Sequence, residues 1–145
     1  QIVEAKSIGA DVVLLLANVL DASQIKQFAK FAKSLGLEVL LEIRDKAELD
    51  SVNEFVDAVG VNNRDLKDFT VNVSQSFDLV NLIPTDFVKV SESGIDSAKT
   101  IVDLKEAGFN GFLMGETFMK NSRPEIACAN FIKEVSALKN SLIQL

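Results

Sequence analysis

Polar residues follow four apolar runs of this 145-residue sequence, and their types suit acid–base chemistry and anion binding. The runs end as LLEIRD, GVNNRDL, VSESGI and FLMGET, and they supply Glu42, Asn62, Asn63, Arg64, Glu92, Ser93, Gly94, Gly115, Glu116 and Thr117. A positioned carboxylate can act as a general acid or base, and a guanidinium binds anions. Polar groups at four strand ends in succession indicate a site at one edge of a sheet.

The amino-acid composition limits which residues can move a proton. The sequence has no histidine and no tyrosine, and its one cysteine is Cys128. These absences exclude Ser-His-Asp triads, His-ligated zinc, an intrachain disulfide framework and multi-thiolate metal sites. Asp, Glu and Lys therefore remain for proton transfer, because Cys128 lies in IACANFI on an expected helix and is interpreted as a small core residue.

Charge and hydropathy patterning exclude other classes. Lys plus Arg is 15 and Asp plus Glu is 21, a net charge of −6, which argues against a general nucleic-acid binder or a polybasic membrane sensor. No apolar run approaches the ~20 residues of a membrane span. No signal-peptide pattern opens the sequence, so the expected compartment is the cytoplasm.

The elements that must position these polar residues follow a repeated pattern of helix end, glycine and apolar run, as in SLGLEVLLEI. Its steps of roughly 24–27 residues fit a βα repeat. The near-continuous apolar runs are typical of parallel strands covered on both faces. Strands are predicted at 12–17, 38–43, 57–62, 87–91 and 111–115, and helices at 22–35, 45–54, 73–83, 97–107 and 124–143.

The first residues form a further expected helix. Residues 1–8 have helical apolar spacing but no capping residue before them, and Gly9 is a plausible residue after the helix end. A helix that begins without a cap suggests a chain cut from something longer. The alternative is a short frayed helix that remains after a leader is removed.

Alternating strands and helices predict an α/β fold with a parallel sheet. Five strands suit a flavodoxin-like open sheet by length, whereas a complete (β/α)₈ barrel needs about 200 residues or more. Part of a barrel remains possible, and residues 1–145 show no linker. We therefore expect one architectural unit of five parallel strands, which is either an open sheet or part of a barrel.

Two glycines at successive strand ends suggest phosphate binding. Gly94 precedes a helix expected to start near Asp96, and Gly115 precedes a short helical stretch from Glu116. Glycine lets a phosphate approach the backbone, and helix N-termini offer N–H donors. In barrels the phosphate site often lies in the last two βα loops.

LEVLLEIRD, GVNNRDL, VSESGI and FLMGETFM together resemble the indole-3-glycerol phosphate synthase family, and the resemblance covers the whole chain. It implies a (β/α)₈ barrel of tryptophan biosynthesis whose fourth to eighth strands lie here, so that residues 1–145 would form one incomplete barrel domain of five parallel strands that lacks the first three βα units. By the resemblance, the catalytic residues are Glu42, the general base, and Asn62 and Glu92, which contact the substrate. The substrate-pocket residues are Arg64, Leu66 and Leu113, and the phosphate-binding residues are Ser93, Gly94, Gly115 and Glu116.

The family closes an indole ring on a phosphorylated carboxyphenylamino-deoxyribulose, with loss of carbon dioxide and water. The resemblance implies no metal and no cofactor. The family's general-acid lysine lies on the third strand, before this sequence begins, so the chain alone is expected to be inactive. Its expected partners are a phosphorylated substrate and either the missing amino-terminal half or a second copy of itself.

Other interpretations stay open at this point. The chain can be a non-catalytic half-barrel that self-associates, or another phosphate-binding barrel such as phosphoribosylanthranilate isomerase, or a flavodoxin-like receiver or nucleotide module. Single residues also have plainer roles: Arg64 can pair with Asp65 or Asp68 at the surface, and Leu66 and Leu113 can be ordinary packing residues. Lys26, Lys30 and Lys33 are expected on a solvated helix face.

Overall fold

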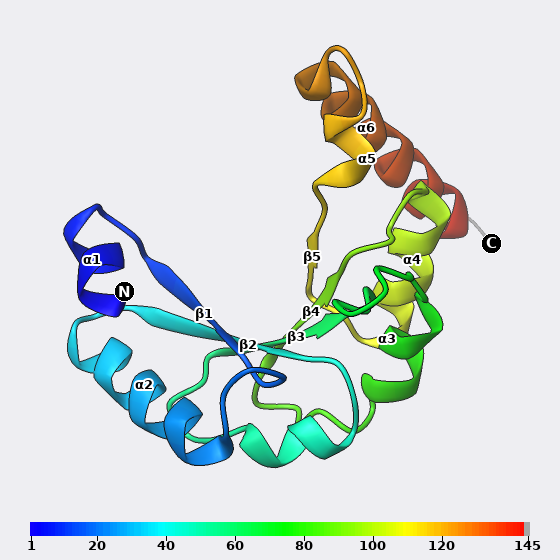
Figure 1. Ribbon diagram of the computed structural model, residues 1–145. Coiled ribbons are helices and arrows are strands. Elements are labelled where there is room, and N and C mark those ends of the chain that lie inside the picture. Colours follow the sequence, from blue (N-terminus) through cyan, green and yellow to red (C-terminus); the bar gives the residue numbers. More distant parts are fainter. Residues whose placement is uncertain (144–145) are drawn as a thin grey trace.

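The computed structural model describes residues 1–143, and it consists of strands that alternate with helices (Figure 1). The elements are α1 (Ile2–Ser7), β1 (Val12–Leu16), α2 (Ala22–Ser34), β2 (Glu38–Ile43), the 3₁₀ helix η1 (Ala47–Ser51), β3 (Ala58–Asn62), α3 (Ser74–Leu79), β4 (Val88–Glu92), α4 (Ala98–Ala107), β5 (Gly111–Leu113), α5 (Glu116–Met119) and α6 (Pro124–Ile143). The five predicted strands are all confirmed. No helix in this part of the chain is long and apolar enough to span a membrane.

The strands form one parallel sheet in the order β1-β2-β3-β4-β5. A flavodoxin-like sheet has the order 2-1-3-4-5, so the sequential order excludes it and is that of part of a barrel. Figure 1 shows a curved sheet with α2, η1, α3 and α4 on its convex side, and none of the described helices lies over the concave side. Within residues 1–143, β1 and β5 each pair with a single strand.

Alternation along each strand divides the sheet into an outer, helix-covered face and an inner face. Outer-face side chains of β2 and β3 are almost fully buried, as are the α2 residues that belong to the same core: Ile25, Ala29, Ala32, Val39, Leu41, Ile43, Val59 and Val61. The strand β1 is covered less well than its continuous apolar run predicted. Val13 and Leu15 are buried, whereas Val12 and Leu14 on the inner face are 48% and 49% exposed.

The same alternation places the polar strand-end residues on the inner face. Glu42 is in register with Gly60, and Gly60 with Val90, in one layer across the sheet. Asn62 is in register with Glu92, and Glu92 with Leu113, in the next layer towards the carboxyl ends. The side chains of Glu42, Asn62, Glu92 and Leu113 therefore share one face without any unusual backbone geometry.

Two helices are capped as their sequences require. Asp21 and Gln24 form a reciprocal capping box at the start of α2. Ser97 accepts a hydrogen bond from the Thr100 N–H at the start of α4, which ends at Gly108 with φ +119°. These side-chain and backbone hydrogen bonds replace the intrahelical partners that terminal peptide groups lack.

Some predicted boundaries were wrong. The helix expected over 45–54 is only the 3₁₀ helix η1, because Asp45 accepts hydrogen bonds from the N–H groups of Ala47 and Glu48 and Val52 returns to extended backbone. The helix α3 ends at Leu79, before the predicted residue 83. The strand β5 ends at Leu113, so Gly115 is the residue that caps α5.

A buried polar network joins β3, α3 and β4 on the outer face. The Asn63 amide nitrogen donates to Ser91 Oγ at 3.2 Å and to the Ser93 carbonyl at 3.1 Å. Its oxygen accepts from the backbone N–H of Ser76 at 3.1 Å and from Ser76 Oγ at 2.9 Å. Asn63 thus uses both amide hydrogens and its oxygen, and it fixes the backbone that follows β4.

We expect Asn63→Ala to lower the free energy of unfolding by about 3 kcal/mol, because the hydroxyls of Ser76 and Ser91 and the Ser93 carbonyl would lose a buried partner. The measurement is urea unfolding followed by circular dichroism. Asn121→Ala is the matched control, since Asn121 donates only to carbonyls at an exposed helix end and should change stability by no more than about 0.5 kcal/mol. Equal effects of the two substitutions would contradict the role given to the network.

Candidate functional site at the carboxyl ends of the strands

Three polar side chains meet on the inner face of β2, β3 and β4. The Asn62 amide nitrogen donates to Glu42 Oε1 at 3.0 Å, and Glu92 hydrogen-bonds to Glu42. Asn62 is held in turn, because its own oxygen accepts from the Arg64 N–H at 2.9 Å. The structure therefore brings together the three residues that the family resemblance suggested as catalytic.

Glu92 is 5% exposed, and its Oε1 is buried without a hydrogen-bond partner among the described residues. Burial raises the pKa of Glu92 to about 8, helped by the negative charge of Glu42 and the hydrogen bond to it. The Glu92 side chain is therefore a neutral acid at pH 7. When two carboxyl groups lie together in a poorly solvated site, the state with one proton and one negative charge is more stable than the state in which both groups are ionised.

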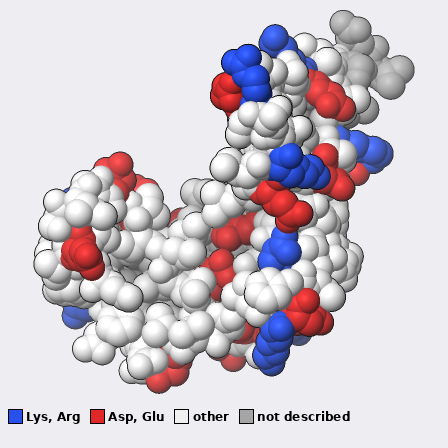
Figure 2. Space-filling model, turned by 45° about the horizontal axis from the view of Figure 1, so that its top comes forward, with Lys and Arg blue, Asp and Glu red and all other residues white. Residues whose placement is uncertain are grey.

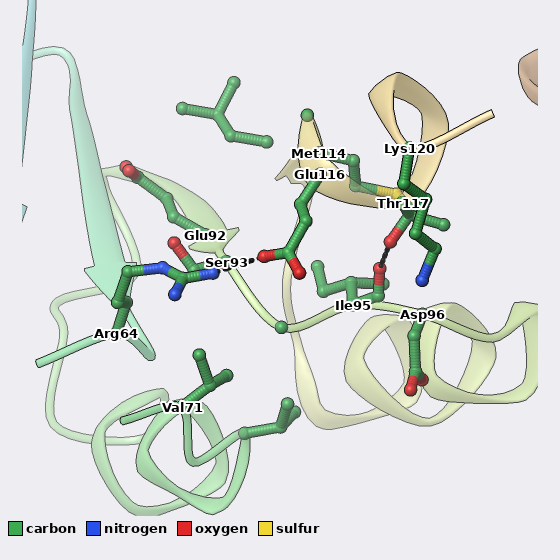
Figure 3. Close-up of a pocket in the computed structure, with 14 residues that line it drawn as sticks. Arg64, Val71, Glu92, Ser93, Ile95, Asp96, Met114, Glu116, Thr117 and Lys120 are labelled. Atoms are coloured by element: carbon green, nitrogen blue, oxygen red, sulfur yellow. Dashed lines mark hydrogen bonds and ion pairs between the residues drawn. The ribbon is translucent and has the colours of Figure 1, made fainter. Parts of the chain in front are cut away.

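A pocket of about 820 Å³ opens beside this pair, lined by the segments that follow β3, β4 and β5. Arg64 reaches across it and forms an ion pair with Glu116, 2.5 Å between Nη2 and Oε2 (Figure 3). Arg64 does not pair with Asp65 or Asp68, as the surface alternative supposed. Asp65 instead pairs with Arg44 at 2.6 Å, which joins the loops after β2 and β3.

The loop after β4 has an unusual backbone. Ser93 and Gly94 both have left-handed φ values, +67° and +72°. A Cβ on Gly94 would also lie 2.2 Å from Val71 Cγ1, so both conformation and space require glycine there. The helix α4 starts at Ala98 behind the Ser97 cap, later than expected, so Gly94 lies in a loop before the helix rather than at its first turn.

The second glycine loop is tied to the first. Gly115 lies directly before α5, and Thr117 Oγ1 donates to the Ile95 carbonyl at 2.6 Å, a bond that Figure 3 draws between the two loops. Lys120 also lines the pocket. The space between the loops therefore has backbone N–H groups and an ammonium group available to an anion.

The two apolar candidates differ in position. Leu113 lines the pocket and is 47% exposed, whereas Leu66 lies on the loop after β3, is 41% exposed and is not among the pocket residues. Neither side chain is an ordinary core residue.

Cys128 is half-buried in an apolar groove with Phe112 and Phe131, so it contributes to packing without being fully enclosed.

Charge is distributed unevenly over the molecule. Figure 2 shows acidic atoms in the hollow at its centre and separate acidic groups on the left part of the molecule, where the rest of the surface is mostly uncharged. Lys26 and Lys33 are exposed as predicted and pair with Glu54 and Asp57.

No group of three or more His, Cys, Asp or Glu side chains that could hold a metal occurs in the described part of the chain.

Some residues that line or support the site were not anticipated from the sequence. Lys120 lies four residues after Glu116, a spacing that would place both on one side of a helix, but α5 is only one turn long. Asn63 was noted as a strand-end residue without a role, and the structure gives it one as a support for Ser93. Gly60 carried no signal, because nothing in a strand sequence shows which neighbouring side chain fills the space beside a glycine.

A parallel sheet in sequential order, with polar loops gathered at its carboxyl ends, defines the (β/α)-barrel class. The solved structures agree. The chain matches a tryptophan synthase α-subunit from Pyrococcus furiosus with a TM-score of 0.69, at 17% identity, over 94% of this chain and 59% of that one. It matches 3-hexulose-6-phosphate synthase from Salmonella typhimurium with a TM-score of 0.65, at 18% identity, over 91% of this chain and 63% of that one.

Sequence comparison identifies the particular family. The family model described as indole-3-glycerol phosphate synthase matches residues 1–133, and the chain belongs to that family. It is 46% identical over 135 residues to the indole-3-glycerol phosphate synthase of Bacteroides thetaiotaomicron, covering 93% of this chain and 52% of that protein. The Variovorax paradoxus protein of the same name is 40% identical over 92% of this chain and 50% of its own length. The chain thus spans about half the length of these relatives.

The raised pKa of Glu92 leads to a pH dependence of stability. A carboxyl group that keeps its proton in the folded state while the unfolded chain ionises makes the folded state less stable as pH rises. We expect the free energy of unfolding to fall between pH 4.5, the ordinary pKa of a glutamate, and the raised pKa of about 8, with Glu92 contributing a few kcal/mol of the loss. Glu92→Gln should flatten this part of the profile. Parallel profiles for the two proteins, measured by urea unfolding, would show that Glu92 titrates normally.

Proposed function

We propose that the chain is the carboxyl part of an indole-3-glycerol phosphate synthase, and that a complete barrel containing it closes the indole ring with loss of carbon dioxide and water. One observation supports this proposal most directly. Glu42 and the protonated Glu92 lie together on the inner face, beside an open pocket flanked by two glycine loops. Such an enzyme works on phosphorylated metabolites, and its expected place is the cytoplasm.

In the proposed reaction Glu42 is the general base that takes the ring proton. The Asn62 amide, 3.0 Å from Glu42 Oε1, holds the Glu42 carboxylate in a fixed orientation. Glu92 is neutral at pH 7, so it adds no second negative charge beside the base and can donate a hydrogen bond. The acid that removes the hydroxyl group is, by family resemblance, a lysine on a strand outside this chain.

The proposed phosphate site lies between the loops after β4 and β5. Backbone N–H groups of Gly94, Gly115 and Glu116 can approach a phosphate closely, because two of these residues have no side chain. The Ser93 N–H donates to the Leu113 carbonyl at 3.4 Å, so Ser93 would contribute its hydroxyl group. Lys120 supplies a positive charge at the same pocket. The observed hydrogen bond from Thr117 to Ile95 fixes the separation of the two loops.

The remaining candidate residues suit the aromatic and charged parts of the substrate. Leu113 would form an apolar wall beside the ring, and Leu66 would approach from the loop after β3. Arg64 would contact the substrate, and an arriving anionic group would compete with Glu116 for the guanidinium, since both are anions at one site. Arg64 is thus already held across the pocket before substrate binds.

The exposed edges of the sheet suggest that another part of a barrel packs against this chain. The β1 end of the sheet has an apolar groove of about 650 Å³ lined by α1, β1 and α2, including Val3, Leu14 and Phe31. We propose that residues 1–145 are one incomplete barrel unit whose open edges are covered by an amino-terminal half of the family's barrel. A second copy of the chain is the alternative occupant.

The first test concerns the base. In a complete synthase that carries this segment, Glu42→Gln should lower kcat by about 10²–10⁴-fold, the usual contribution of a positioned base, with little change in KM. Product formation can be followed by indole fluorescence. The control is Glu38→Gln, an exposed glutamate on the same face at the other end of β2. A near-normal kcat for Glu42→Gln would remove Glu42 from the proposed catalytic role.

The second test concerns the edges. An open, apolar sheet edge favours association, so the isolated chain should sediment as a dimer or a larger assembly. Addition of the amino-terminal part of the B. thetaiotaomicron relative should replace that assembly with a one-to-one complex. A 15.8 kDa monomer that unfolds cooperatively and ignores the added half would contradict the proposed partner.

A further inference from the structure

Gly60 occupies the centre of β3, where a glycine is unfavourable for the strand itself. Glycine has no side chain to pack and weakens a strand interior. The backbone does not require it, because Gly60 is not among the glycines with positive φ. It is buried on the inner face, in the layer that contains Glu42 on one side and Val90 on the other. A reason for glycine must therefore come from the space around it.

That space is filled by Glu92. A Cβ built on Gly60 would lie 1.9 Å from Glu92 Oε1 and 2.9 Å from Glu92 Cδ, and 3.3 Å from Leu40 Cδ1. Glu92 belongs to the next layer, in register with Asn62. Its carboxyl group leans back over the bare backbone of Gly60 and so reaches the layer of Glu42. Figure 3 agrees, since the Glu92 carboxyl group is turned away from the Arg64–Glu116 pair.

We infer that Gly60 is a positioning residue for the reaction: its missing side chain is the gap that lets the Glu92 carboxyl group lie against Glu42. This inference rests on the proposed function for the effect on turnover, but the packing it describes does not. The charged group beside the Glu92 carboxyl group is Glu42 from β2, and the ion-paired Arg64 and Glu116, with Asp96 and Lys120, line the adjoining pocket. An added methyl group would push the Glu92 carboxyl group from Glu42 towards the pocket and that ion pair.

The geometry separates this role from a role in folding. The atoms that a Cβ would meet are the end of a flexible side chain, so Glu92 can rotate away without a backbone shift. Leu40 needs to move by only a few tenths of an ångström. An alanine also restricts the unfolded chain more than glycine does. Gly60→Ala should therefore keep the fold and disturb the carboxyl pair.

The experiment uses a complete synthase that carries this segment, with Gly60→Ala and the control Gly111→Ala. Gly111 is in the same layer on β5, has no positive φ, and its Cβ would meet only Val90 Cγ2 at 3.5 Å, an ordinary contact. We expect Gly60→Ala to lower kcat by about 10²-fold, the cost of a displacement of about 1 Å, with KM changed less than about threefold. Its thermal midpoint should not fall, and Gly111→Ala should behave like the parent.

Two further readouts identify the route of the effect. The Glu92 titration, followed by ¹³C NMR of the carboxyl carbon, should move to lower pH in Gly60→Ala, because the group leaves Glu42 and gains solvent. In a Glu92→Gln background, Gly60→Ala should cost much less turnover than it does in the parent. An equal cost in both backgrounds, or an unmoved titration, overturns the inference.

If Gly60→Ala does not fold, the double variant Gly60→Ala/Glu92→Asp tests whether the clash with Glu92 is the cause. The shorter acid leaves room for the methyl group, so the double variant should fold; its failure to fold would overturn the inference. The inference and the proposed function fail in different ways. If Gly60→Ala has normal turnover while Glu42→Gln has strongly reduced turnover, only the inference is overturned. If Glu42→Gln and Glu92→Gln both have normal turnover, the proposed function is overturned.

Discussion

The site depends on the burial of one carboxyl group, that of Glu92, against another, that of Glu42. In water two such groups would both ionise at about pH 4, but two negative charges cannot share a poorly solvated site. The pair therefore keeps a proton, and burial assigns it to Glu92. The surrounding features serve this arrangement. Asn62 donates to Glu42, Gly60 leaves space for Glu92, and the sheet register places all four residues in two adjacent layers.

The consecutive residues Asn62 and Asn63 have different roles because side chains alternate between the two faces of a strand. Asn62 faces inward and meets Glu42, and Asn63 faces the helices and meets Ser76 and Ser91. The hydrogen bond from Asn63 to the Ser93 carbonyl then supports the left-handed backbone of the loop after β4. One dipeptide thus orients the proposed base on one face and braces the proposed phosphate loop from the other. A one-residue register slip would exchange these roles.

The sequence predicted the strands and their polar ends well, because long apolar runs between glycines leave few alternatives. It also predicted that Glu42, Asn62 and Glu92 would converge, since the carboxyl ends of parallel strands meet at one edge. It could not predict that Arg64 pairs with Glu116, fifty-two residues away, rather than with Asp65 or Asp68 nearby. Nor could it show that Glu92 leans into the gap above Gly60. Both features depend on side-chain directions in the folded sheet, which periodicity does not encode.

The arrangement of the site explains how part of a barrel can hold an organised set of the proposed catalytic groups. Glu42, Asn62, Glu92 and the two glycine loops come from four consecutive strands, so neighbouring hydrogen bonds within one sheet position them. Groups on the far side of a complete barrel would face these residues across the interior. These residues would not need contacts with those groups to keep their orientation. Barrel closure would then contribute the proposed acid, cover the half-exposed Val12 and Leu14, and exclude water from the carboxyl pair. Exclusion of water strengthens the electrostatic coupling between Glu42 and Glu92, so closure would affect the proton balance of the pair as well as complete the set of reacting groups.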